Sequence, residues 1–97
     1  MQGCDLVSWL HETDHLSDVL RRLRAAQELT LQEVADYAGM AKSYISMIER
    51  GQKSPERDTL IALLLAAFSL PVPLANRVLL FAGYAPLHHR ALARQAA

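Results

Sequence analysis

The sequence predicts an all-α protein: a compact bundle of five helices with a short arm before it and a tail after it. Apolar residues recur at the 3.6-residue spacing of a helix along most of the chain, and capping residues and glycines separate these apolar segments. No segment shows the alternation of apolar and polar residues that predicts a strand. Because 97 residues can bury only one modest core, we expect an arm at residues 1–16, one domain at residues 17–83 and a tail at residues 84–97.

The arm and the first core helix are predicted from capping and apolar spacing. Residues 5–11 are expected to form a short helix in the arm. Ser17 is the expected N-cap of the first core helix, because its hydroxyl can accept a hydrogen bond from the first turn. The inward-facing residues of that helix, at helical spacing, are expected to be Val19, Leu20, Leu23 and Gln27.

The second helix, the turn after it and the third helix form the most informative part of the chain. Thr30 and Glu33 have the spacing of a capping box, in which each side chain bonds the other residue's backbone amide. Ala35 is small enough to let two helices joined by a short turn cross closely. Gly39 supplies the turn, because a positive φ is accessible to a residue without Cβ. The third helix is therefore expected at about residues 41–50, at a steep angle to the second.

The third helix is expected to have one buried and one exposed face. Ile45 and Ile48 are three residues apart and lie on the buried side. The opposite face carries polar and flexible side chains, namely Lys42, Ser43, Ser46, Met47 and Arg50. Two short helices in this geometry are a common means of placing one helix in the major groove of DNA.

Two apolar helices are expected to complete the bundle. Pro55 should fix the entry to a fourth helix at about residues 57–69. A fifth is expected at residues 73–82, with Gly83 ending it. Since the fourth contains LIALLLAAF, apolar on nearly every face, part of it or of the fifth is expected to contact a partner. Residues 87–97 are expected to form a basic final helix or to fray.

These motifs resemble the phage repressor and Cro family of helix-turn-helix proteins, in its branch of bacterial regulators. The resemblance extends from about residue 19 to residue 80 and includes LTLQEVADYAGM, SYISMIERG and KSPERDTLIALLLAAFSL. It implies a lambda-repressor-like fold in which Arg24 of the first helix pairs with Glu49 of the third as a structural ion pair. It also implies a cytoplasmic, sequence-specific regulator of transcription, a repressor acting as a homodimer on double-stranded DNA.

The resemblance and the exposed face of the third helix together give the expected site residues. The residues expected to read bases are Lys42, Ser43, Ser46 and Met47. The residues expected to contact phosphates are Thr30, Gln32, Tyr44, Arg50 and Lys53. The excess of apolar surface from Leu60 through Phe81 gives the expected contacts of the homodimer, which are Val78, Phe81 and Tyr84. Ala41 and Met47 depart from the family pattern, which usually has a Ser or Thr cap and a long polar residue there, so base contact and no contact both stay open for Met47.

Composition leaves a rival function open. The net charge is zero, whereas nucleic-acid binding draws much of its affinity from Lys and Arg. An antitoxin-like or adaptor protein with the same fold would instead bind another protein through its fourth and fifth helices or through the arm around Trp9. Against this rival, Lys42, Arg50 and Lys53 gather on or just after the third helix.

Enzymatic, metal-dependent and membrane functions are less favoured. Residues 11–15 match the H-E-x-x-H zinc motif, but a catalytic site needs a third ligand and a substrate cleft. We therefore expect a solvated helix end, no enzymatic activity, no metal and no cofactor. The single Cys4 and the lack of a leader-like segment favour the cytoplasm. Pro71 and Pro73 interrupt the longest apolar stretch, which argues against a membrane span.

Overall fold

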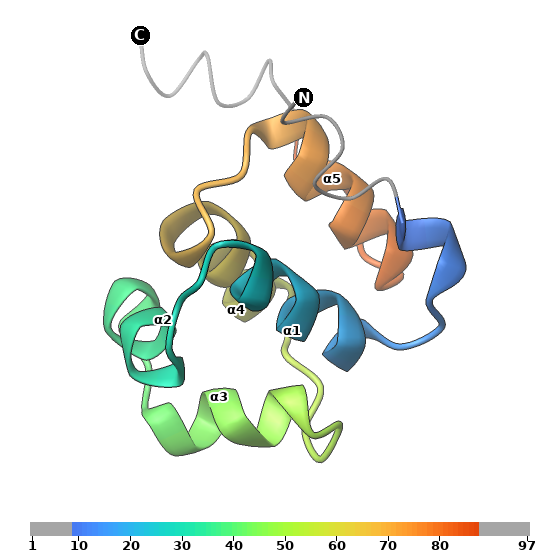
Figure 1. Cartoon of the computed structure of the whole chain (residues 1–97). Coiled ribbons are helices and arrows are strands. Elements are labelled where there is room, and N and C mark those ends of the chain that lie inside the picture. Colours follow the sequence, from blue (N-terminus) through green and yellow to red (C-terminus); the bar gives the residue numbers. More distant parts are fainter. Residues whose placement is uncertain (1–8, 88–97) are drawn as a thin grey trace, which may run out of the picture.

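The structure, a computed structural model, describes residues 9–87 and is all-α, as predicted (Figure 1). α1 lies at the centre, α2 and α3 lie on one side of it, and α5 lies on the other. Within the described residues there is no strand. The elements in chain order are α1 (Leu16–Ala26), α2 (Leu31–Ala38), α3 (Lys42–Glu49), α4 (Arg57–Ala62), the π-helical η2 (Leu63–Ala67) and α5 (Val72–Phe81).

α1 begins earlier than its sequence suggests. His15 is the N-cap, with an extended backbone, so the expectation that Ser17 caps this helix is wrong. The backbone amides of Asp18 and Val19 already bond the carbonyl of His15, which places Ser17 inside the first turn. Gln27 lies at the C-cap, where its Nε2 donates to the carbonyl of Phe68 at 2.8 Å. The apolar face is buried as predicted, at Val19, Leu20 and Leu23.

A short 3₁₀ turn at residues 9–12 lies before α1, and the rest of the helix expected at residues 5–11 falls outside the described residues. Leu10 is buried in the core. The guanidinium of Arg22 lies 4.9 Å from the ring centroid of Trp9, a cation-π contact. These two contacts attach the described part of the arm to the domain.

The capping and turn chemistry predicted for α2 is confirmed. The amide of Glu33 donates to Oγ1 of Thr30 at 3.0 Å, and the amide of Thr30 donates to Oε1 of Glu33 at 2.8 Å. Gly39 ends the helix at φ 71°, and a Cβ added there would meet nothing within 4 Å. The left-handed backbone, and not lack of space, is therefore what requires glycine. Ala35 is fully buried between the helices.

The fourth apolar segment does not form the single α-helix expected at residues 57–69. α4 ends at Ala62 and continues as the π-helical η2, where the amide of Phe68 donates to the carbonyl of Leu63 at 2.9 Å. A π turn holds more residues than an α turn, and here it brings the consecutive Leu63 and Leu64 both into the core. The expected surplus of exposed apolar surface on this segment is therefore largely buried within one molecule.

α5 buries one face and exposes another. It spans Val72–Phe81, one residue earlier at each end than expected, and Gly83, the glycine expected to end it, follows at φ 87°. Val78 is fully buried, so the expectation that it contacts a second copy is wrong: its side chain is inside the core. Leu80, by contrast, is 60% exposed.

The segment that follows α5, residues 84–87, is bound to the domain. The hydroxyl of Tyr84 donates to a carbonyl in the loop before α4 at 2.8 Å, and Nε of Arg57 donates to a carbonyl of the segment at 3.0 Å. Asn76 of α5 accepts from the amide of Leu87 at 2.7 Å and donates to its carbonyl at 3.1 Å. Across residues 9–87, none of the helices has the length and apolar character needed to cross a membrane.

Candidate nucleic-acid interface

α3 presents the expected polar face to the surface of the molecule. Ile45 and Ile48 are buried beneath it, at 3% and 2% exposure. The outward residues line a groove of about 400 Å³. All four expected base-reading residues are in its lining, which consists of Lys42, Ser43, Ser46, Met47, Arg50 and, from α2, Leu31.

Leu31 is the member of this groove that sequence reasoning missed. It is the first residue of α2, directly after the Thr30 cap, and it is half-buried against the core. The capping box fixes where α2 begins, and α2 packs against α3, so Leu31 lines the same groove as the outward residues of α3. The sequence did contain a signal for this residue, because an apolar side chain directly follows the cap of the second helix.

The residues expected to contact phosphates are spread around the groove. The hydroxyl of Thr30 accepts from Glu33 and retains its own proton as a donor. Gln32 donates to Oδ1 of Asp36 at 2.8 Å, which leaves one amide hydrogen for another acceptor. Tyr44 is half-buried and packs against the core.

The two basic residues of this set, Arg50 and Lys53, occupy different places. Both are exposed. Arg50 lines the groove of α3, whereas Lys53 lines a smaller hollow of about 160 Å³ formed with the start of α1 and the loop after α3. The structure therefore gathers Arg50, but not Lys53, with the expected base-reading residues.

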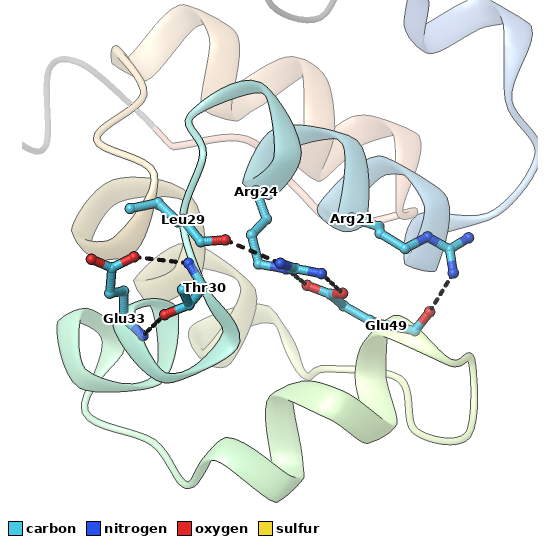
Figure 2. Close-up of polar contacts among 6 residues, drawn as sticks. All are labelled: Arg21, Arg24, Leu29, Thr30, Glu33 and Glu49. Atoms are coloured by element: carbon cyan, nitrogen blue, oxygen red, sulfur yellow. Dashed lines mark hydrogen bonds and ion pairs between the residues drawn. The ribbon is translucent and has the colours of Figure 1, made fainter.

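A bidentate ion pair attaches the C-terminal end of α3 to α1, as predicted (Figure 2). Nε of Arg24 donates to Oε2 of Glu49 at 2.6 Å, and its Nη2 donates to Oε1 at 2.9 Å. The third guanidinium nitrogen donates to the carbonyl of Leu29 at 3.0 Å, in the turn before α2. One side chain thus connects α1, the entry to α2 and α3.

Burial gives this pair its strength. The side chain of Glu49 is only 8% exposed and that of Arg24 is 23% exposed. The hydrogen bond with Glu49 raises the pKa of Arg24, against the opposing effect of its burial. Arg24 therefore stays charged in any ordinary buffer. Moving α3 away from α1 would leave the buried carboxylate without its two hydrogen bonds, which would cost free energy. The pair therefore fixes how α3 lies on the domain.

The acidic residue of α3 is paired inside the domain, and its basic groups face outward. The carboxylate of Glu49, the one acid of α3, bonds Arg24. Lys42 and Arg50 are exposed and line the groove. The zero net charge of the chain therefore coexists with a cationic surface along α3, which suits a polyanionic partner.

The three residues expected at a homodimer contact differ in how far they are exposed. Phe81 is half-buried and lines a hollow of about 410 Å³ together with Leu80. Tyr84 is half-buried and uses its hydroxyl inside the domain, on the carbonyl of Pro55. Val78 is inside the core. Leu80, which sequence reasoning did not single out, is the most exposed large apolar side chain in the part of the chain that the structure describes.

The H-E-x-x-H segment does not place its histidines on one helical turn. His11 lies on the 3₁₀ turn of residues 9–12, and His15 is the extended N-cap of α1. Nε2 of His11 lies 3.7 Å from Glu12. Among the described residues, no three or more His, Cys, Asp or Glu side chains are grouped so that they could hold a metal ion.

Comparison with known proteins agrees with this geometry. Residues 20–67 match the family model described as helix-turn-helix. The chain is 42% identical over 79 residues to the transcriptional regulator ClgR of Mycobacterium tuberculosis. The aligned residues cover 81% of this chain and 67% of ClgR. It is 33% identical over 70 residues to y4dL of Sinorhizobium fredii, an uncharacterized HTH-type transcriptional regulator, over 72% of this chain and 35% of that protein. The chain therefore belongs to the repressor- and Cro-like helix-turn-helix family of transcriptional regulators.

Proposed function

We propose that the protein is a transcriptional regulator that binds a specific double-stranded DNA sequence by inserting α3 into the major groove. The observation that carries this proposal is the groove of α3, in which the cationic side chains of Lys42 and Arg50 flank Ser43, Ser46 and Met47. The ion pair of Arg24 and Glu49, which holds α3 in a fixed orientation, supports it further. Family membership supports the same function.

The groove residues have different roles in this proposal. Lys42 lies at the first position of α3 and can donate to the O6 and N7 acceptors of guanine. Ser43 can form a hydrogen bond with more than one base, so it discriminates little between them. Ser46 and Met47 lie one turn deeper. The residues proposed to bind the flanking phosphates are Thr30, Gln32, Tyr44, Arg50 and Lys53. The backbone amides at the start of α2 that the cap leaves free can add to these contacts.

The proposed regulator is a cytoplasmic repressor that acts as a homodimer on a two-fold operator. Occupying promoter DNA requires nothing beyond binding, so repression is the simplest effect. The exposed Leu80 and the half-buried Phe81 beside it offer an apolar surface for a second copy. Two-fold pairing through this face would require the two α3 helices to lie about 34 Å apart, one turn of DNA.

Selection of bound sequences from a random pool of DNA duplexes tests the proposal. At low salt, the protein should enrich a motif with two half-sites about one helical turn apart. A matched control carries Lys42→Ala and Arg50→Ala, two exposed positions whose replacement leaves the core intact. The control should enrich that motif much more weakly and with at least one base position relaxed. Equal, motif-free recovery by both proteins would contradict the proposal.

A second candidate function is favoured by the hollow that Leu10, Leu80 and Phe81 line on the far side of the domain. An antitoxin-like or adaptor protein would bind another protein in this hollow. Such binding does not need the excess of Lys and Arg that nucleic-acid binding favours, so a net charge of zero is compatible with it. An electrophoretic shift with genomic fragments, compared with partners recovered by a pull-down, separates the two functions. Loss of partners on Leu80→Glu, without any DNA shift from the unmodified protein, would favour this second function.

A further inference from the structure

The lining of the groove of α3 includes two apolar side chains, Leu31 and Met47, and the roles assigned above leave out Leu31 and name no contact for Met47. We propose that Leu31 and Met47 together recognise the C5-methyl group of a thymine in the operator. This inference rests on the proposed DNA-binding function and adds a specificity that this function does not by itself require.

The two residues come from different helices and meet at one groove. Leu31 is the first residue of α2, and Met47 lies in the second turn of α3. The other four lining residues are Lys42, Ser43, Ser46 and Arg50. Covering apolar surface with an apolar group removes it from water and lowers the free energy of the complex. The major groove offers one such apolar group, the methyl of thymine.

Met47 is available for this contact. It is half-buried, but it is not among the apolar side chains that pack against the core, whereas Leu31 is. Leu31 therefore supplies a fixed wall. Met47 supplies an unbranched, adaptable side chain that can close on a small ligand.

The cationic residues of the groove favour thymine over 5-methylcytosine, which carries the same methyl group. Thymine presents the O4 acceptor beside its methyl, whereas cytosine presents an amino donor. Lys42 and Arg50 carry only donors, while the hydroxyls of Ser43 and Ser46 can donate or accept. The two charged groups therefore favour the O4 acceptor over the amino donor.

The spacing along α3 predicts where the thymine lies. Lys42 and Met47 are five residues apart, which is about 7.5 Å along a helix axis. Successive base pairs are about 3.4 Å apart. The thymine should therefore lie within about two base pairs of the guanine that Lys42 contacts.

The test uses the operator obtained by selection, so failure to obtain any operator would count against the proposed function alone. In that operator each thymine is replaced singly by deoxyuridine, which lacks only the methyl, and the unmodified protein is titrated. One thymine in each half-site should lose about fourfold in affinity, the equivalent of about 0.8 kcal/mol for one buried methyl-sized group. Other thymines should change less than twofold.

Variants assign the effect to the two residues. Met47→Ala and Leu31→Ala should each bind the thymine and uracil operators equally. The control Tyr37→Ala, an exposed position of α2 that does not line the groove, should keep the fourfold difference. A 5-methylcytosine–guanine pair at that position should not restore binding. The inference would be overturned if no thymine were sensitive to uracil, if the sensitivity survived in both variants, or if 5-methylcytosine replaced thymine without loss.

Discussion

At the scale of single residues, the position of α3 depends on a carboxylate that is almost entirely buried. Glu49 is the one charged residue in the core within residues 9–87, and it accepts two hydrogen bonds from Arg24. The same guanidinium also bonds the turn before α2. Changes at this pair should therefore alter the stability of the domain and the orientation of α3 together.

Replacing one member of the pair should be more damaging than replacing both. Arg24→Ala or Glu49→Ala should each lower the free energy of unfolding by about 3 to 5 kcal/mol, toward the lower value because Arg24 is 23% exposed. The double replacement Arg24→Met with Glu49→Leu should lower it much less, because no charge is left unpaired. Urea denaturation of the unmodified protein, of Arg24→Met, of Glu49→Leu and of the double variant completes a double-mutant cycle. Small, additive effects would show that the pair does not hold α3.

Lys42 and Arg50 line the same groove, but replacing each of them should weaken DNA binding in a different way. Lys42→Ala should weaken operator binding by about 1 to 3 kcal/mol and relax one base position, because a base contact is lost. Arg50→Ala should weaken operator and random DNA alike and reduce the salt slope by about 1, because a phosphate contact is lost. Fluorescence anisotropy at several salt concentrations measures both. If both variants lost the same affinity on both DNAs, Lys42 would not read bases.

At the scale of elements, the local chemistry of α2 and its turn could be predicted, whereas the packing of the apolar helices could not. The bonds of Thr30 with Glu33 and the φ of Gly39 involve only neighbours in sequence, so their spacing was sufficient. The π turn at Leu63–Ala67 has no such signal. It forms where tertiary packing takes two consecutive leucines into the core, and periodicity assumes one regular helix.

The face of α5 shows the same limit. Its sequence VPLANRVLLF is apolar in most directions, so the pattern did not decide which side is buried. The structure buries Val78 and Leu79 and exposes Leu80, and this choice depends on what lies beneath the helix. Leu31 escaped prediction for a related reason, because its role appears only when two helices meet.

The turn between α2 and α3 should tolerate a side chain at a modest loss. At Gly39 only the left-handed backbone opposes substitution, since an added Cβ meets nothing within 4 Å. Gly39→Ala should therefore lower the free energy of unfolding by about 1 kcal/mol, and Gly39→Asn by less, because asparagine adopts this conformation more readily. Thermal denaturation gives both values. A loss of several kcal/mol in the alanine variant would mean that the turn is more crowded than the structure has it.

At the scale of the whole molecule, the two sides of the domain offer different surfaces. The α3 side is cationic, and the α5 side has the exposed Leu80 beside its hollow. This division suits a protein that binds DNA with one face and a second copy of itself with the other. It also explains how a chain of zero net charge can present a binding surface for a polyanion.

Assembly should depend on Leu80. Leu80→Glu should give a folded monomer with weaker operator binding, because a carboxylate cannot be buried cheaply in an apolar contact. Tyr37→Glu is the matched control: Tyr37 is the other exposed large apolar residue of the described chain, at 56%, and lies on α2. Sedimentation equilibrium should show dimers for the unmodified protein and the control. An unmodified protein that stayed monomeric at micromolar concentration, both free and on DNA, would exclude the dimer.

The central claim is that α3 is the surface that reads DNA, and nuclear magnetic resonance tests it most directly. The ¹⁵N-labelled protein is titrated with the selected operator while every backbone amide is followed. The account predicts that the largest changes in amide chemical shift occur along α3, at Lys42–Glu49, and at Leu31 at the start of α2. The amides around Leu80 on α5 should shift much less, because DNA does not contact them. Largest shifts on the α5 face with α3 unchanged, or no shifts at all with the operator, would contradict it.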